Sequence, residues 1–242
     1  MTRRLGVLGG TFDPIHFGHL DAADAARSAL ALDQVLFVPT HDPPHRLAGP
    51  RAAAFHRFAL TALAVNDREG YRVSDLELAR DGRSYTSDTL RSLHADGWQP
   101  SQLFFILGAD AFAEIATWHE FPSVLDAAQF LVIARPGTTV DQAVMRTPEL
   151  GPRTRRTVGH IDDAGPTAIF LIEAHTRAVS STTIRERIAA RQSIHDLVPP
   201  AVARHITVNR LYETGSLSPH RAGAAGTPME DDLHGHKNDR DA

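Results

Sequence analysis

Cysteine is absent from all 242 residues of the chain. Its absence excludes disulfide bonds, thiolate metal sites and a cysteine nucleophile, and it agrees with a cytoplasmic location, where structural disulfides are rare. Runs of about 18 apolar residues, the length that a membrane-spanning helix needs, are also missing. The chain starts with a short apolar run instead of the long apolar region of a secretory signal. We therefore expect a cytoplasmic protein that does not contact a membrane.

Positive charge is not in excess. The chain carries 25 Lys and Arg against 29 Asp and Glu, a formal net charge of -4, and both signs are interspersed. This balance produces no broad positive field of the kind that attracts nucleic acid, so no nucleic-acid partner is expected. An anionic ligand must instead be attracted by a local site. Composition leaves the oligomeric state open, a homo-oligomer included.

Short apolar runs bounded by turn residues alternate with longer segments of helical spacing. Apolar runs that lack a period of two predict strands buried on both sides. Their alternation with helices predicts an α/β fold, with a Rossmann-like, doubly wound, mostly parallel sheet and helices on both faces. The predicted strands are Leu5 to Leu8, Val35 to Val38, Leu103 to Leu107, Phe130 to Ile133 and Ile169 to Ile172. The predicted helices are His19 to Ala31, Arg51 to Asn66, Thr86 to Ala95 and a broken stretch from Ala111 to Ala128.

Other segments depart from this pattern. Tyr71 to Leu78 mixes apolar and charged residues, which predicts a partly exposed strand at an edge. Helices predicted over Thr182 to Ala190 and Pro200 to Asn209 form a small C-terminal helical part of one domain, residues 1–212. Residues 213–242 hold too few bulky apolar side chains to offset the entropy of ordering and predict a disordered tail. Gly137 to Gly165 is interpreted as a variable, partly helical insertion.

A first group of polar and small residues follows the first predicted strand. Gly9 and Gly10 allow a backbone to approach a ligand closely, and Gly18-His19 opens an Ala-rich helix. Helix N-termini at the carboxyl ends of parallel strands present free N–H groups to phosphate. His16 and His19 are three residues apart, a spacing that brings both imidazoles to one face of a helical turn. Either feature alone is more often structural, but their order along the chain predicts a phosphate site.

The usual dinucleotide fingerprint, Gly-x-Gly-x-x-Gly, is missing here, because Gly6, Gly9 and Gly10 do not have that spacing. A dehydrogenase that transfers a hydride is therefore disfavoured.

A second polar group precedes the helix predicted at Thr182. Four consecutive hydroxyl residues, 180–183, are followed by Arg185. A plain helix N-cap is one interpretation, because Ser and Thr are preferred caps. One hydroxyl is enough for a cap, however, and four hydroxyls with a guanidinium form a dense set of donors for phosphate oxygens. The group thus predicts a second phosphate site.

The string His16-Phe17-Gly18-His19 resembles the His-x-Gly-His signature of a nucleotidyltransferase superfamily. The longer string from Gly9 to His19 is similar to that of bacterial nicotinate-nucleotide adenylyltransferases, enzymes of NAD biosynthesis. The string Val179 to Arg185 is similar to the family's Ile-Ser-Ser-Thr-x-Ile-Arg, with Val179 in place of Ile. This resemblance covers residues 5–212. It implies transfer of AMP from ATP to nicotinate mononucleotide, giving deamido-NAD and pyrophosphate, with Mg²⁺ bridging the ATP phosphates.

The resemblance also implies roles for single residues. The expected catalytic residues are His16, His19 and Arg185, which stabilise charge on the reacting phosphates. Residues expected to bind ATP come from three strand ends or helix starts: Gly9, Gly10, Thr11, Phe12, Gly18, His19, Gly108, Asp110, Ser180, Ser181, Thr182 and Arg185. Mg²⁺ needs few protein ligands when it is held by phosphates and water, so no metal-binding residue is expected.

Weaker motifs in the middle of the chain predict the acceptor. Pro43-Pro44-His45-Arg46 is similar to the family's Pro-His-Lys loop, with Arg46 in place of Lys. Tyr85-Thr86 begins an element similar to Tyr-Thr-x-Asp-Thr, in which the Thr86 position lies against the nicotinate carboxylate. Each segment has a structural alternative, namely a rigid basic loop and a capped helix start.

Two further segments complete the expected acceptor site. Asp110 follows a strand within Gly-x-Asp, a family segment that contacts ribose. Trp118 matches the family tryptophan that stacks on the pyridine ring, although core packing is its structural alternative. Arg135 follows the strand that ends at Ile133 and is expected to reach a phosphate. The expected acceptor-binding residues are His45, Arg46, Tyr85, Thr86, Asp110, Trp118 and Arg135.

Alternatives stay open at this point. Another adenylyltransferase acting on nicotinamide mononucleotide or phosphopantetheine shares the His-x-Gly-His site, and a non-catalytic nucleotide sensor retains the same pocket. The preference between nicotinate and nicotinamide is not set by any spacing in the sequence.

Overall fold

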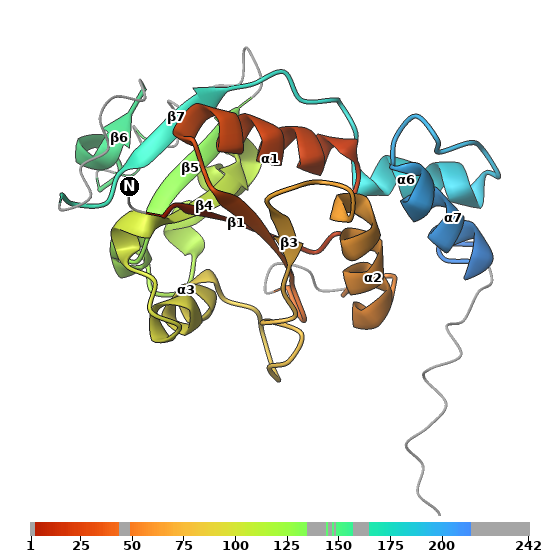
Figure 1. Ribbon diagram of the computed structural model, residues 1–242, viewed down its shortest axis with the longest axis horizontal. Helices are drawn as coiled ribbons and strands as arrows, with labels where there is room; N and C mark the ends of the chain where they lie inside the picture. The colour runs from red at the N-terminus through yellow and green to blue at the C-terminus, as the bar shows by residue number, and fades with distance from the viewer. Residues whose placement is uncertain are drawn as a thin grey trace, which may run out of the picture.

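A seven-stranded sheet forms the centre of the protein, in the strand order β3-β2-β1-β4-β5-β7-β6 (Figure 1). This computed structural model describes residues 3–43, 49–134, 144, 147, 149–156 and 165–213. The strands are β1 (Leu5–Gly10), β2 (Gln34–Pro39), β3 (Tyr71–Val73), β4 (Leu103–Gly108), β5 (Gln129–Ala134), β6 (Thr154–Arg155) and β7 (Ile169–Glu173). The α-helices are α1 (Phe17–Leu30), α2 (Ala54–Val65), α3 (Thr86–Ala95), α4 (Ala109–Ala113), α6 (Ser181–Ala189) and α7 (Pro200–Val208).

All the strand pairs among the described residues are parallel. The chain builds outward from β1 through β2 to β3, and then returns to place β4 against the other side of β1. The order therefore reverses between β1 and β4, and in open α/β sheets ligands bind outside the carboxyl ends of the strands at such a point. Gly10 and Gly108 end these two strands.

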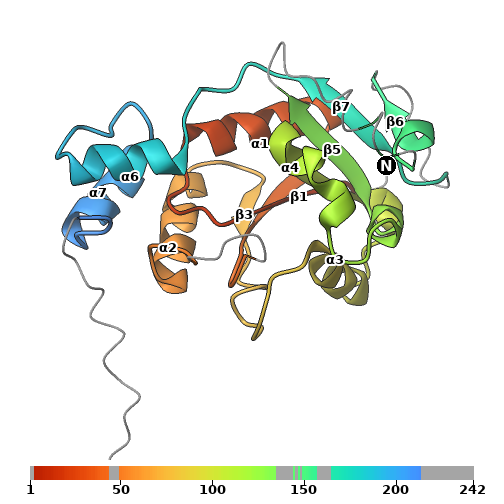
Figure 2. The same ribbon diagram turned by 180° about the vertical axis from the view of Figure 1, so that it is seen from behind.

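Successive strand residues point to opposite sides of the sheet, so an apolar strand gives the sheet two apolar faces. Helices cover both of them. Phe104 and Ile106 pack in one core cluster with residues of α1 and α2. Phe105 and Leu107 pack in a second cluster with residues of α3 and α4. The two views show α1 and α2 on one face and α3 and α4 on the other (Figures 1 and 2). The doubly wound α/β fold predicted from the sequence is confirmed.

The predicted C-terminal helical part is present, with α6 and α7 at one end of the sheet beside α2 (Figure 1). Buried residues of α7, such as Val202 and Ile206, belong to the same core cluster as α1. None of the described helices has the length and apolar character to cross a membrane.

Some predicted boundaries differ in the structure. The edge position of the strand at Tyr71 is confirmed, but pairing ends at Val73, and the residues after it turn inward and bury Glu77. The stretch from Ala111 to Ala128 becomes α4 and two short 3-10 turns, η2 (Ile115–Thr117) and η3 (Ser123–Asp126).

At the opposite edge, β6 is an unpredicted strand of only two residues that follows the 3-10 turn η4 (Gly151–Arg153), and so short a segment has no apolar pattern to signal it. Another 3-10 turn, η1 (Pro100–Gln102), precedes β4. Most of the predicted insertion 137–165 and all of the predicted tail from residue 214 onward lie outside the described residues.

Candidate active site

A cavity of about 1130 Å³ opens at the carboxyl ends of β1 and β4, where the strand order reverses. It brings together predicted residues that are far apart in the sequence. Those that line it are Gly9, Gly10, Thr11, His16, Gly18, His19, Tyr85, Thr86, Gly108, Asp110 and Trp118. Both the expected phosphate end and the expected acceptor end of the site therefore contribute to one cavity.

His16 and His19 stack against each other at the start of α1, with ring centroids 3.7 Å apart. His16 is the N-cap residue and His19 lies in the first turn of the helix. The backbone N–H of His16 donates to Nδ1 of His19 over 3.2 Å. Because Nδ1 of His19 accepts, a neutral His19 carries its proton on Nε2 and has one N–H to offer to a ligand.

The pKa of His19 is held well below its usual value. Burial of the ring is the larger cause, because it penalises the charged form, and repulsion from the neighbouring His16 adds to it. His19 is therefore neutral near pH 7. An anion bound beside it acts in the opposite direction and favours the protonated ring.

Two glycines leave little room beside aromatic rings of this segment. A Cβ on Gly18 would lie 3.1 Å from Nδ1 of His16, and a Cβ on Gly10 would lie 2.9 Å from the ring of Phe12. Phe12 has a left-handed backbone, with φ of 47°, and its ring is buried in the core at 2% exposure. The ring meets His19 edge-on with centroids 5.1 Å apart. Phe12 thus supports the histidine pair from behind and does not line the cavity.

The second signature, residues 180–185, lies next to the cavity rather than in its wall. Ser180 caps α6 by accepting a hydrogen bond from the backbone N–H of Thr183. Val179, directly before it, does line the cavity. The wall of the cavity does not include Ser180, Ser181, Thr182 or Arg185.

Two side chains of α6 reach back to the turn that precedes His16. Oγ of Ser181 donates to the carbonyl oxygen of Pro14 over 2.8 Å, and Nη1 of Arg185 donates to that of Asp13 over 2.7 Å. Arg185 also donates to Thr182 over 3.0 Å. These contacts connect the second signature to the first, the string from Gly9 to His19.

Tyr85, Thr86 and Trp118 form the opposite end of the cavity. The ring of Tyr85 stacks on His119 with centroids 4.4 Å apart. Trp118 packs edge-on against Phe105 of β4, with centroids 5.8 Å apart, and is half-buried. The structure thus gives Trp118 a packing contact and a place in the cavity wall at the same time.

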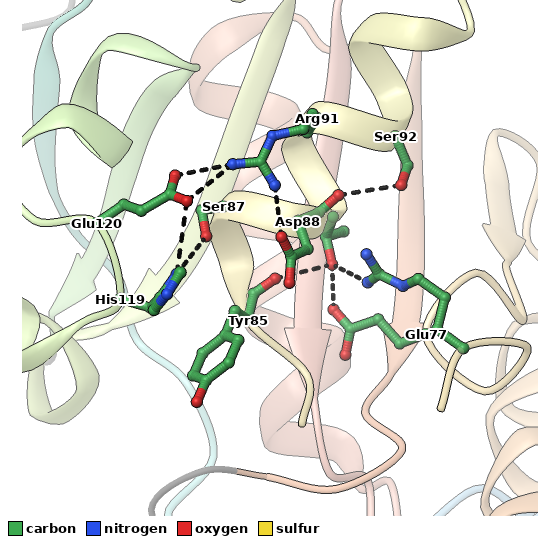
Figure 3. A network of polar contacts seen from close by, with 10 residues as sticks. Glu77, Tyr85, Ser87, Asp88, Arg91, Ser92, His119 and Glu120 are labelled. Atoms are coloured by element: carbon green, nitrogen blue, oxygen red, sulfur yellow. Dashed lines mark hydrogen bonds and ion pairs between the residues drawn. The ribbon is translucent and has the colours of Figure 1, made fainter. Parts of the chain in front are cut away.

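Side chains of α3 hold this end together (Figure 3). Arg91 donates to Asp88 of its own helix and to both carboxylate oxygens of Glu120, the latter over 2.9 Å. Oγ of Ser87 lies 3.1 Å from Nδ1 of His119. Glu120 has a left-handed backbone, with φ of 61°. The segment that carries Trp118 and His119 is thereby tied to the start of α3.

Glu77 is buried in the cavity wall, at 5% exposure. One of its carboxylate oxygens accepts from the hydroxyl of Thr89, whose oxygen lies 3.3 Å from the carbonyl oxygen of Tyr85. Burial raises the pKa of Glu77, and hydrogen bonds from Thr89 and Ser84 oppose that shift. Glu77 therefore stabilises the turn that presents Tyr85.

Three comparisons with known proteins identify the family and the fold. The model of the cytidylyltransferase-like family matches residues 7–187. A probable nicotinate-nucleotide adenylyltransferase from Desulfitobacterium hafniense (strain Y51) is 38% identical over 214 residues, which are 87% of this chain and 96% of the relative. One from Chromohalobacter salexigens is 41% identical over 210 residues, 86% of this chain and 95% of the relative. The chain belongs to the nicotinate-nucleotide adenylyltransferase family.

A solved structure supports the fold. The nicotinic acid mononucleotide adenylyltransferase of Plasmodium falciparum, solved in complex with NaAD, aligns with a TM-score of 0.66 at 18% identity, over 87% of this chain and 97% of that one. The sequence-based assignment to this adenylyltransferase family is confirmed by the relatives, and the fold by the solved structure.

Several residues that sequence reasoning did not single out as binding residues also line the cavity of this family member: Thr40, Glu77, Arg83, Ser84, His119 and Thr176. Thr40 directly follows β2, so its position at a strand end was a signal that could have found it. Arg83 and Ser84 stand next to Tyr85 in sequence. No local sequence pattern indicates that Glu77 is buried, because a charged residue in a segment of mixed polarity is expected to be exposed. The predicted His45, Arg46 and Arg135 lie outside the described residues.

Proposed function

We propose that this chain transfers the adenylyl group of ATP to nicotinate mononucleotide, forming deamido-NAD and pyrophosphate in NAD biosynthesis. The observation that carries the proposal is the single cavity at the β1/β4 switch point, which has the stacked His16 and His19 at one end and Tyr85, Thr86 and Trp118 at the other. Its size suits two nucleotides end to end. The names of the relatives support the same pair of substrates.

The reaction is a single displacement. An oxygen of the acceptor phosphate forms a bond to the α-phosphorus of ATP while the bond from that phosphorus to the bridging oxygen breaks and pyrophosphate leaves. The attacking phosphate is already ionised near neutral pH, so no general base is needed. Catalysis then consists of positioning and stabilisation of the developing charge.

His16, His19 and Arg185 are the proposed catalytic residues. His19 donates from Nε2 to the α-phosphate or the leaving oxygen, because its Nδ1 is already occupied. Arg185 lies outside the cavity wall in the free protein, and its guanidinium already bonds the carbonyl oxygen of Asp13. We propose that its remaining N–H groups, together with Ser180, Ser181 and Thr182, hold the β- and γ-phosphates.

The remaining ATP contacts come from the strand ends. The proposed contacts are the backbones of Gly9, Gly10, Thr11, Gly18 and Gly108 and the carboxylate of Asp110. Phe12, whose ring is buried, contributes by fixing the position of His19.

The acceptor is proposed to lie between Tyr85-Thr86 and Trp118. The backbone N–H groups at the start of α3 suit its carboxylate, and the indole face suits its pyridine ring. Asp110 is proposed to bond the ribose. His45, Arg46 and Arg135 remain proposed contacts of the acceptor from the sequence resemblance.

A divalent metal ion is general in nucleotidyltransferases, and we propose Mg²⁺ for this one. Among the described residues no group of three His, Asp or Glu side chains is placed to hold a metal. The cavity does offer the exposed carboxylates of Asp110 and Glu114, and oxygen donors are what Mg²⁺ takes. When bound, the ion would neutralise phosphate charge. Its ligands would be the ATP phosphates, water and at most these carboxylates.

We further propose that the protein is cytoplasmic and has no nucleic-acid partner. Size-exclusion chromatography with light scattering tests whether it forms a homo-oligomer.

Pyrophosphate release separates an enzyme from a nucleotide sensor. The purified chain is incubated with ATP and Mg²⁺, with and without nicotinate mononucleotide, and pyrophosphate is measured. We expect release only when both substrates are present. Tight ATP binding without release would favour the sensor and contradict the proposal.

A further inference from the structure

Asp13 lies three residues before His16, and its side chain is almost fully buried, at 1% exposure. Oδ2 accepts from the backbone N–H of Arg51 over 2.7 Å. Oδ1 accepts from the backbone N–H of Ala52 over 3.0 Å and from the hydroxyl of Tyr212 over 2.9 Å. Three donors from two distant segments thus fix one carboxylate.

The backbone of the same turn carries the second signature. The carbonyl oxygens of Asp13 and Pro14 accept the bonds from Arg185 and Ser181 described above. Two residues later the chain reaches His16. The position of α6 relative to the histidine pair therefore depends on how firmly the Asp13-Pro14 turn is held.

Tyr212 is the donor that comes from farthest away, 199 residues along the chain. It follows α7 and is half-buried, and its side chain does not line the cavity. Burial and the adjacent carboxylate of Asp13 raise its pKa above the usual value. The hydroxyl consequently stays protonated and remains a donor at every pH at which the protein works.

We propose that Tyr212 is a positioning residue for ATP. By holding Asp13 it keeps the Asp13-Pro14 turn in the conformation that aligns Arg185 and Ser181 with His16. The C-terminal segment thereby becomes part of the donor site without touching the nucleotide. The inference rests on the proposed function in one respect, that the ATP phosphates lie between the two signatures.

The chain offers a matched control. Tyr71 also donates from its hydroxyl to a carboxylate, that of Asp24, over 2.5 Å, and burial and Asp24 raise its pKa to about 12. Tyr71 lies on the edge strand β3 and Asp24 lies on α1, and neither residue lines the cavity. Tyr71→Phe thus removes the same kind of bond away from the site.

The test compares Tyr212→Phe with Tyr71→Phe, each checked for folding by thermal unfolding. For Tyr212→Phe we expect the KM for ATP to rise about 5- to 20-fold, as the loss of a hydrogen bond to a charged group allows, with the KM for nicotinate mononucleotide changed less than about twofold. Tyr71→Phe should leave both KM values unchanged. Equal changes of both KM values in Tyr212→Phe, or none, would overturn the proposal and leave Tyr212 a structural anchor of α7.

A double-mutant cycle tests whether Asp13 and Tyr212 act together on ATP binding. Asp13→Asn removes the charge that holds the Tyr212 hydroxyl, and it should weaken ATP binding in the same selective way. If the two residues act together, adding Tyr212→Phe to Asp13→Asn costs little more. Additive losses would contradict the proposal. The cycle is measured by calorimetry with a non-hydrolysable ATP analogue, so it remains informative even if turnover with nicotinate mononucleotide, and with it the proposed function, fails.

Discussion

The proposed donor region (residues 9–19 and 180–185) and the proposed acceptor region (residues 85–91 and 118–120), called the donor and acceptor regions below, are built by different means. In the donor region, side chains bond to backbone carbonyl and N–H groups of buried turns, as with Arg185 and Asp13. In the acceptor region, side chains bond to other side chains, and the ion pair of Arg91 with Glu120 that ties α3 to the Trp118 segment is exposed. Backbone contacts fix a geometry, whereas exposed ion pairs are weak and adjustable.

The difference suits the two tasks proposed above. On that proposal, the donor region holds a transition state whose phosphate geometry is the same in every turnover, and preorganised groups stabilise it best. The acceptor region is proposed to bind one planar ring and a ribose phosphate. Substitutions of the proposed catalytic residues in the donor region should therefore lower kcat, and substitutions of the residues that position them, such as Asp13, should weaken ATP binding. Substitutions in the acceptor region should raise the KM of the acceptor.

The largest effect should come from His19→Ala. The substitution removes the Nε2 donor and the ring that stacks on His16. We expect kcat to fall by a factor that corresponds to about 2–4 kcal/mol of transition-state stabilisation, with much smaller changes in either KM. Initial rates of pyrophosphate release measure this. Near-normal turnover would remove His19 from the catalytic site.

Trp118→Ala should act on the other region. Stacking of a base on an aromatic side chain contributes about 1–3 kcal/mol, so the KM for nicotinate mononucleotide should rise about 5- to 100-fold. The KM for ATP should change less than about twofold. Trp98, which is not in the cavity wall, provides the control Trp98→Ala. An equal loss of affinity for both substrates would place Trp118 outside the acceptor pocket.

Arg91→Gln should have a smaller effect in the same direction. It releases Glu120 from α3 and so removes one of the ties that hold the segment of Trp118 and His119, while the contact of Ser87 with His119 stays. Because exposed ion pairs are weak, we expect the KM for the acceptor to rise less than about threefold at low salt. At high salt, which screens the pair, the difference in this KM between the variant and the unmodified chain should shrink. Arg187→Gln breaks a comparable exposed pair with Asp196 and should leave the acceptor KM unchanged. A salt-independent effect would contradict the ion-pair explanation.

The smallest predicted effect concerns pH. The folded chain holds the pKa of His19 below the usual value of about 6.5, so as pH falls through about 6.5 the unfolded chain gains a proton that folded His19 does not take up. His19 therefore lowers the free energy of unfolding on acidification. Urea unfolding at pH 7 and pH 5 should show a smaller loss for His19→Gln than for the unmodified chain. The exposed His175→Gln is the control, and equal losses in both variants would contradict the shift.

Prediction from sequence worked best where the signal is contiguous. The run from Gly9 to His19 contains strand end, turn and helix start within a few residues, so both its placement and its family could be predicted. The acceptor residues Tyr85 and Trp118 come from separate elements, and only the family resemblance predicted that they face one site. Their individual roles, like those of Ser180 to Arg185, stay predictions.

Other features had no sequence signal. The bond from Tyr212 to Asp13 joins residues 199 apart, and no local pattern reports such a contact. Glu77 is buried because the chain turns after β3, whereas its charge suggested an exposed edge. That Arg185 bonds a backbone carbonyl instead of lining the cavity also depends on tertiary packing. Local patterns predict elements, and long-range contacts decide what those elements present.

The most direct test of the central claim is a competition for ATP. Nicotinate mononucleotide, nicotinamide mononucleotide and phosphopantetheine are mixed at equal concentration with limiting ATP and Mg²⁺. The products are separated and quantified by mass spectrometry, and the ratios of their amounts give the ratios of kcat/KM. We predict that deamido-NAD dominates. A dominant product from either other acceptor, or no dinucleotide at all, would contradict the account.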